Sequence, residues 1–97
     1  MTGADADKAV RVRVSGRVQG VWYRGWTGQR AEALGLSGWV RNRFDGSVEA
    51  VFAGPAALVD QMVAECRAGP PAAHVREVAV EPTDWPAGPG FGQRPTV

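Results

Sequence analysis

The stretch GRVQGVWYR, from Gly16 to Arg24, lies between an alternating apolar segment and the start of a helical pattern. It marks the point where a strand gives way to a helix. Gly16 and Gly20 carry no Cβ to block a ligand, so several backbone N–H groups can face one concavity. Arg24 falls in the first helical turn, where the helix dipole is positive, and adds a planar guanidinium group. This combination predicts a loop that binds phosphate or a carboxylate.

A glycine-bracketed turn also has a simpler interpretation, as a tight connection with Arg24 in solvent. These residues alone leave both interpretations open. The stretch has neither the GxxxxGK[ST] nor the GxGxxG spacing, so it does not indicate nucleotide binding.

The elements on either side follow from hydrophobic periodicity. Valines that alternate with arginines predict a half-buried strand from Val10 to Ser15. Apolar residues at helical spacing predict a helix over residues 23–34 that ends at Gly35, with Leu36 packing back in a Schellman arrangement. Strands are predicted over residues 36–42 and 48–52, joined by a tight turn.

The second half of the chain repeats this order. Gly54 and Pro55 predict the cap and first turn of a second helix, whose apolar stripe is made by Leu58, Met62 and Cys66. A strand is expected over residues 75–81. A short terminal segment over residues 91–97 contains a proline, which restricts it to a sheet edge. Residues 1–7 are predicted to form a disordered tail and residues 8–97 one domain.

This order of elements predicts an α+β fold, a ferredoxin-like two-layer sandwich of βαββαβ type with a short extra C-terminal strand. Its sheet is mostly antiparallel, with two helices on one face. In this topology the first two strands run in the same direction, so their carboxyl ends meet at one rim. Asn42, at the end of the second strand, is therefore expected beside the anion loop, where its amide can hold a water molecule. A local role for Asn42 in its own turn is the alternative.

Composition limits the functions that are possible. The chain has 97 residues, 44% of them hydrophobic and 22% charged, with a net charge of +1. Attraction of nucleic acid or an anionic membrane by bulk charge is therefore not supported. Stacking aromatics of an RNA-binding sheet are also missing from the first and third strands, which carry Arg11, Arg13, Glu49 and Val51 on that face.

The single cysteine, Cys66, excludes an internal disulfide and a zinc cluster built from thiolates. It fits the apolar stripe of the second helix and is predicted to be a core residue rather than a nucleophile. His74 is expected on the surface. We expect a cytoplasmic monomer that needs no metal or cofactor and has no nucleic-acid or membrane partner.

Two stretches resemble the acylphosphatases, which are small hydrolases of the carboxyl–phosphate bond with this fold. They are SGRVQGVWYRGWT, from Ser15 to Thr27, and LGLSGWVRNRFDGSVEAVFAG, from Leu34 to Gly54, and they cover about a third of the chain. The terminal GFGQRPTV is similar to the ending of bacterial members. Trp22 and Tyr23 stand where the family often has phenylalanine or another bulky residue.

The resemblance implies that Arg24 and Asn42 are the catalytic residues, Arg24 contacting the phosphate and Asn42 orienting the attacking water. It implies a phosphate site formed by Ser15, Gly16, Arg17, Val18, Gln19, Gly20, Val21 and Arg24. The activity implied is metal-independent hydrolysis of small acyl phosphates to a carboxylate and inorganic phosphate, which is both product and inhibitor. The alternative is a non-catalytic βαββαβ module that binds an anion or has a regulatory role.

Overall fold

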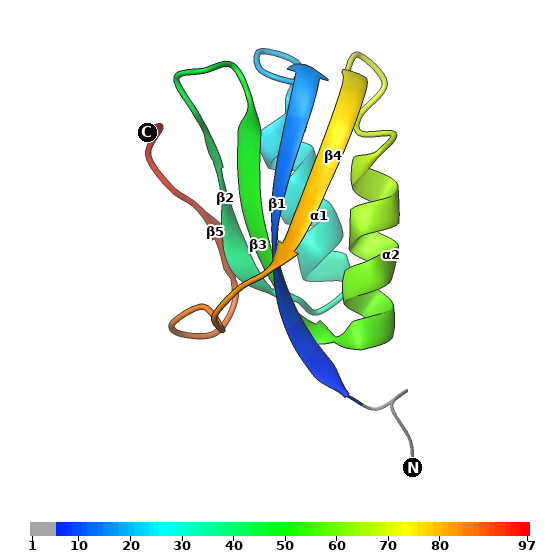
Figure 1. Ribbon diagram of the computed structural model, residues 1–97, viewed down its shortest axis with the longest axis vertical. Helices are drawn as coiled ribbons and strands as arrows, with labels where there is room; N and C mark the ends of the chain where they lie inside the picture. Colours follow the sequence, from blue (N-terminus) through cyan, green and yellow to red (C-terminus); the bar gives the residue numbers. More distant parts are fainter. Residues whose placement is uncertain (1–5) are drawn as a thin grey trace.

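A computed structural model describes residues 6–97 as a sheet with two helices packed on one of its faces (Figure 1). The elements in chain order are β1 (Asp7–Arg17), α1 (Tyr23–Ala33), β2 (Ser37–Asn42), β3 (Val48–Pro55), α2 (Ala56–Cys66), β4 (His74–Pro82) and β5 (Phe91–Gln93). This arrangement confirms the predicted ferredoxin-like α+β sandwich. Neither helix within residues 6–97 is long and apolar enough to cross a membrane.

The order of strands across the sheet is β4-β1-β3-β2-β5. β3 pairs antiparallel with both β1 and β2, so β1 and β2 run in the same direction. β5 pairs parallel with β2 at the edge of the sheet, which makes the sheet mixed. The β1–α1 loop and the β2–β3 hairpin therefore lie at the same end of the molecule (Figure 1).

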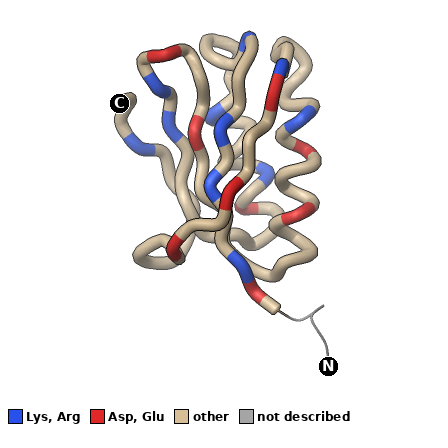
Figure 2. Tube along the Cα trace, viewed as in Figure 1, with Lys and Arg blue, Asp and Glu red and all other residues tan. Residues whose placement is uncertain are grey.

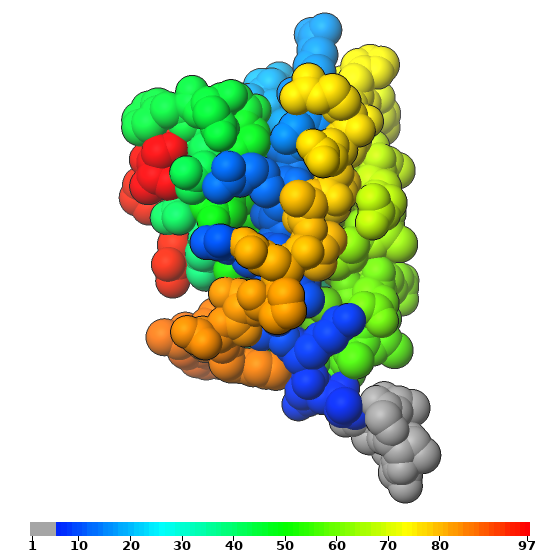
Figure 3. Space-filling view, viewed as in Figure 1, coloured from blue at the N-terminus to red at the C-terminus, as the bar shows by residue number. Residues whose placement is uncertain are grey.

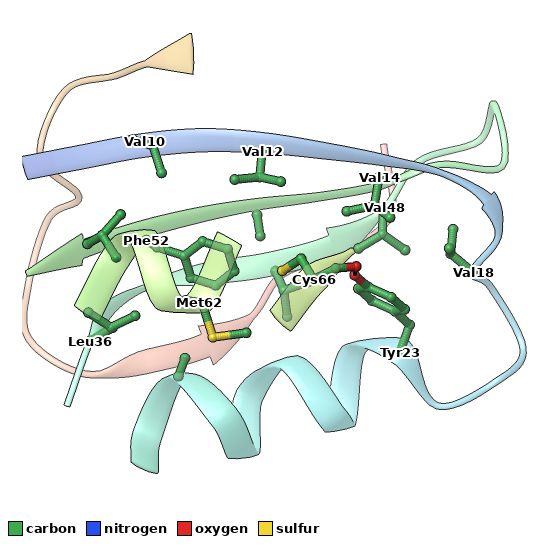
Figure 4. Packing of buried hydrophobic residues seen from close by; sticks show 14 residues of the cluster. Val10, Val12, Val14, Val18, Tyr23, Leu36, Val48, Phe52, Met62 and Cys66 are labelled. Carbon is green, nitrogen blue, oxygen red and sulfur yellow. Dashed lines mark hydrogen bonds between the residues drawn. The ribbon is translucent and has the colours of Figure 1, made fainter. Parts of the chain in front are cut away.

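The core lies between the sheet and the helices. Figure 4 shows Val10, Val12 and Val14 along β1, with Met62 and Cys66 of α2 below the sheet. Alternation places these valines on one face of the strand, and all three are buried. The predicted stripe of α2 is confirmed, with one shift: Val59, Met62 and Cys66 are buried, whereas Leu58 and Val63 are partly exposed at its sides.

β1 is longer than its alternation predicted. Asp7 pairs with Pro55 of β3, so the strand starts inside the region expected to be a tail. Residues 1–5 of that tail lie outside the described residues. At its other end β1 passes Ser15 and reaches Arg17, because β4 supplies partners beyond a register shift between Ser15 and Gly16. Pairing with neighbouring strands thus sets both ends of β1.

The boundary between β3 and α2 also differs from expectation. Gly54 belongs to β3, and Pro55 is the N-cap of a helix that begins at Ala56. The Ala56 N–H donates to the Ala6 carbonyl at 2.9 Å. The end of α1 agrees with prediction. Gly35 has φ 70°, and the Leu36 N–H donates to Ala31 across the helix end.

Charged residues of both signs lie along the strands of the sheet (Figure 2). Those of β1 alternate with its buried valines and so belong to the face that the helices leave uncovered. Glu49 lies at their centre, and only 2% of its surface is exposed. Arg41 Nε and Arg43 Nη1 donate to its Oε1 at 2.8 and 2.9 Å. Arg11 forms an ion pair with Glu81 and approaches Glu49. The pairs Arg11–Glu81 and Arg41–Glu49 join opposite charges on neighbouring strands, which stabilises the sheet.

Burial by itself would raise the pKa of Glu49, but the hydrogen bonds and charges of Arg41 and Arg43 outweigh it and hold the pKa below its ordinary value. Ionised Glu49 therefore stabilises the fold. This contribution is complete above the ordinary pKa of glutamate and is lost as the pH falls through the lowered value.

We expect Glu49→Gln to lower the free energy of unfolding by about 1–3 kcal/mol at pH 7, because it removes the charged acceptor of two arginines. Urea denaturation at several pH values measures the effect. Glu77→Gln, on exposed β4, is the control and should cost less than about 0.5 kcal/mol. The difference between Glu49→Gln and the wild type should shrink below pH 4. A difference that stays constant down to pH 2 would contradict this account of Glu49.

Candidate functional site

A pocket of about 220 Å³ opens at the rim where the β1–α1 loop meets the end of β2. It is smaller than most pockets for drug-sized ligands, so it suits a small molecule. Its polar side chains are those of Arg24, Asn42 and Gln93. The remaining lining residues are small, apolar or aromatic: Val18, Gly20, Trp22, Tyr23 and Gly25.

A second pocket, of about 290 Å³, lies on the open face of the sheet. Its charged lining residues, Arg11, Arg13, Glu49 and Glu81, already form ion pairs with one another or with neighbouring residues. The rim pocket is therefore the better candidate, because Arg24, Asn42 and Gln93 form no ion pair with any residue of the described range 6–97.

The β1–α1 loop offers unused backbone donors to the rim pocket. Within residues 6–97, the N–H groups of Val18 to Trp22 donate to no backbone carbonyl. Gly20 has φ 76° and Trp22 has φ 66°, both in the left-handed region. That conformation is uncommon for a tryptophan and is typical of residues held at functional sites. The loop therefore has the backbone form expected of an anion site.

Arg24 is the second residue of α1, and this helix has no capping side chain at its N-terminus. The free N–H groups of the first turn and the positive end of the helix dipole thus lie next to the guanidinium group. Within the part of the chain that the structure describes, Arg24 forms no ion pair. Its five N–H donors are available to an anion in the pocket.

Asn42, the last residue of β2, lines the same pocket and carries a buried acceptor. Its Oδ1 is buried and has no hydrogen-bond partner among residues 6–97. Asp45 Oδ1, by contrast, holds the hairpin turn by accepting from the Ser47 N–H and hydroxyl at 2.9 and 2.6 Å. The turn therefore does not need the Asn42 side chain, which disfavours the local role considered as an alternative. A buried acceptor without a partner is typically satisfied by water or a ligand.

Gln19 connects the loop to the hairpin. Its Nε2 donates to the carbonyls of Arg43 and Ser47 at 2.7 and 2.8 Å. The side chain predicted to be part of the anion loop thus holds that loop against the residue following Asn42. Gln19 fixes the position of Arg24 relative to Asn42 by bridging two segments that are distant in sequence.

The adjacent aromatic residues have different surroundings. Tyr23 is buried and its hydroxyl donates to the Cys66 carbonyl at 2.6 Å, which anchors the start of α1 on α2 (Figure 4). Trp22 is 59% exposed at the pocket. Its indole lies so close to Gly25 that a Cβ there would be 2.1 Å from Nε1. Gly25 lies inside α1, where glycine is an unfavourable residue, and its missing side chain makes room for the Trp22 indole.

The structure brings together Val18, Gly20, Arg24 and Asn42 from the predicted set, but not all of its members. Ser15 and Gly16 belong to β1 and line a different pocket, with Arg13 and Arg76 among its other residues. Arg17 is exposed and pairs with His74 of β4, whereas Val21 packs against the core.

His74 is exposed, as expected. It pairs with Arg17 and so lies at the base of the β1–α1 loop. A Cβ at Gly16 would be 2.3 Å from its carbonyl oxygen, so β1 and β4 approach closely there. Cys66 is a buried core residue, as predicted. Burial raises the pKa of its thiol to about 12, which keeps it protonated and unreactive near neutral pH.

Sequence reasoning missed Gln93, which reaches the rim pocket from β5. One signal could have found it. Phe91 and Gln93 are two residues apart in an extended segment, so they share a face of the sheet. An apolar Phe91 on the helix-covered face places Gln93 on that face too, beside the N-terminus of α1.

Comparisons with known proteins agree with one another. The family profile described as acylphosphatase matches residues 10–91. A protein named acylphosphatase from Rhodospirillum rubrum is 57% identical over 90 residues, which are 93% of this chain and 99% of that protein. Another of that name, from Rhizorhabdus wittichii, is 54% identical over an alignment of 99 positions that covers 100% of both chains. The solved structure of an acylphosphatase from Coxiella burnetii has a TM-score of 0.87 at 35% identity, covering 91% of this chain and 93% of that one.

Gly20→Ala tests the loop. The added Cβ would meet no protein atom within 4 Å, so the cost to the fold is that of a left-handed alanine, about 1–2 kcal/mol. Because Gly20 lines the pocket, we also expect phosphate binding to weaken about 2- to 10-fold, as for loss of one hydrogen bond. Calorimetric titration with inorganic phosphate and thermal melting measure the two effects.

Gly88→Ala is the matched control. Gly88 has φ 78°, a Cβ there also meets nothing within 4 Å, and its loop lies at the other end of the sheet (Figure 1). It should lower stability by a similar amount and leave phosphate binding unchanged. Equal phosphate affinity in the two variants would contradict the anion-binding role of the loop.

Proposed function

The chain belongs to the acylphosphatase family, and we propose that it hydrolyses small acyl phosphates to a carboxylate and inorganic phosphate without a metal ion. One observation of the site carries this proposal furthest. Val18 and Gly20, whose N–H groups donate to no backbone carbonyl among residues 6–97, line a single small pocket together with Arg24 and with Asn42, whose Oδ1 has no partner in that range. A phosphoryl group and a water molecule are the two ligands that these groups suit.

Arg24 and the loop N–H groups bind the phosphoryl oxygens and stabilise their negative charge. Asn42 Oδ1 accepts a hydrogen bond from a water and holds its oxygen opposite the acyl oxygen. The water oxygen forms a bond to phosphorus as the bond between phosphorus and the acyl oxygen breaks. The electron pair of the broken bond leaves on the carboxylate.

One proton of the water moves to a phosphoryl oxygen, so that the products are the carboxylate and dihydrogen phosphate. The lining residues of the pocket include no aspartate, glutamate or histidine that could act as a base. The substrate's own phosphoryl oxygen is therefore the acceptor. A carboxylate is a good leaving group, so positioning and charge stabilisation are sufficient for catalysis.

The test is release of phosphate from benzoyl phosphate by the purified protein in the presence of EDTA. Turnover that EDTA does not reduce supports the proposal, whereas turnover only after a divalent metal is restored would overturn its metal-independent part. Absence of turnover, together with calorimetric binding of phosphate, would favour the alternative of a non-catalytic anion-binding module.

We further propose that the protein acts as a monomer in the cytoplasm. The free, buried Cys66 is compatible with a reducing compartment. Sedimentation equilibrium at assay concentrations tests the oligomeric state. A mass above that of one chain would contradict the proposed monomer.

Arg24→Ala should weaken inhibition by inorganic phosphate about 10- to 150-fold, the equivalent of a hydrogen bond to a charged group, and should also lower turnover. The reason is that Arg24 contacts the phosphoryl group before and during the reaction. Inhibition of benzoyl phosphate hydrolysis measures the change. Arg67→Ala, which removes an exposed arginine just after α2, is the control and should leave inhibition unchanged. Similar inhibition constants for the two variants would contradict the assignment of Arg24.

Asn42→Ala should lower kcat by about 10²- to 10³-fold, a range typical of the loss of one oriented polar group in a hydrolase. Because Asn42 holds the water and not the phosphate, inhibition by inorganic phosphate should change less than about twofold. Circular dichroism and thermal melting check folding. If a folded Asn42→Ala variant keeps most of its kcat, the water is positioned by another group.

A further inference from the structure

Gln93 is the third polar side chain of the rim pocket and has no role in the reaction described above. Its amide forms no hydrogen bond with another side chain or with the backbone among residues 6–97. Arg24 and the loop can satisfy the phosphoryl oxygens, and Asn42 the water. No residue has thus been assigned to the acyl half of the substrate, and the Gln93 side chain has not been assigned a ligand.

The backbone around Gln93 is fixed by the edge of β2. Gln93 lies opposite Val40 in the parallel ladder, and the next N–H, that of Arg94, donates to the Val40 carbonyl at 2.9 Å. Further along, the Val97 N–H donates to the Asn42 carbonyl at 3.3 Å. The segment that carries Gln93 is therefore bonded to the backbone of the residue that holds the water.

Two further contacts hold this segment. The Phe44 N–H of the hairpin donates to the Val97 carbonyl at 2.7 Å, and Figure 3 shows the end of the chain against the hairpin. On the inner face, Phe91 stacks on Phe52 of the core with ring centroids 5.7 Å apart. Gln93 follows Phe91 by two residues and lies on the same face, next to α1. Gln93 therefore lines the pocket from an edge strand whose backbone these hydrogen bonds hold against β2.

We propose that the Gln93 amide donates a hydrogen bond from Nε2 to the leaving carboxyl group and selects substrates whose phosphate is bonded to a carboxyl. This inference rests on the proposed acylphosphatase activity. The bond between phosphorus and the acyl oxygen breaks with its electron pair on the carboxyl group, so negative charge grows there during the reaction. A donor aimed at that charge stabilises the transition state more than the substrate.

The choice of substrates follows from the position of the charge. A leaving carboxylate shares its charge between two oxygens, one of which was the acyl carbonyl, and an amide N–H can donate to that second oxygen. A phenolate leaving group has no second oxygen. Gln93 should therefore accelerate hydrolysis of acyl phosphates more than that of aryl phosphates.

Gln93→Leu tests this, because leucine has a similar size and no donor. We expect kcat/KM for benzoyl phosphate to fall about 10- to 100-fold, as for loss of a hydrogen bond to a charged group. Any slow hydrolysis of p-nitrophenyl phosphate should change less than about threefold, and inhibition by inorganic phosphate less than about twofold. Over a series of substituted benzoyl phosphates, the rate of the variant should depend more steeply on the pKa of the leaving acid.

Gln29→Leu is the matched control, since it removes an exposed amide from α1 outside the lining of the pocket, and its kcat/KM should equal that of the wild type. If thermal melting shows that Gln93→Leu is unfolded, Gln93→Met removes the donor while keeping an unbranched side chain, and the same results are expected.

Unchanged kcat/KM of a folded Gln93 variant, with an active wild type, would overturn this inference and leave the proposed function standing. Equal losses on benzoyl phosphate and in phosphate inhibition would also overturn it, because Gln93 would then belong to the phosphate site. A wild type without turnover would overturn both the inference and the function on which it rests.

Discussion

The antiparallel hydrogen bonding of β3 to both β1 and β2 is the constraint on which the site depends. Because β3 reverses direction relative to each neighbour, β1 and β2 must be parallel to one another. Their carboxyl ends therefore meet at the same rim, and so do the loop after β1 and the asparagine that ends β2. β3 can hold this position because it is buried along nearly its whole length, with Glu49 neutralised by arginines on the face without helices.

The rim becomes one site because short-range contacts reinforce that topology. Gln19 bonds the β1–α1 loop to the hairpin, Tyr23 anchors the start of α1 on α2, and the segment after β5 bonds to the edge of β2. Each contact uses a side chain or strand edge that the reaction itself does not need. Among residues 6–97, the Arg24 side chain forms no ion pair and Asn42 Oδ1 has no hydrogen-bond partner, so both are available to a ligand. The contacts of Gln19, Tyr23 and the segment after β5 hold the backbone that carries them, as preorganised catalysis requires.

Local patterns in the sequence predicted the element types, the left-handed Gly35 and the shared rim, because periodicity and cap chemistry are properties of neighbouring residues. The strand ends were less predictable. Asp7 and Arg17 are in β1 because β3 and β4 offer them partners, and no local signal encodes the length of a partner strand. The same limit applies to the site. The positions of Arg24 and Asn42 followed from topology, whereas the bridging amide of Gln19 and the pocket amide of Gln93 depend on contacts between distant segments.

The position of β1 inside the sheet, between β3 and β4, has a consequence for how the protein is made. β1 precedes both of its partners, β3 and β4, in the chain and is therefore synthesised before them. Until they emerge, the valines of β1 have no sheet to join and the β1–α1 loop has no hairpin to rest on. Pairings between distant segments form slowly, because the intervening chain must first be closed into a loop. The nascent chain therefore acquires its binding loop only after the β2–β3 hairpin has been translated.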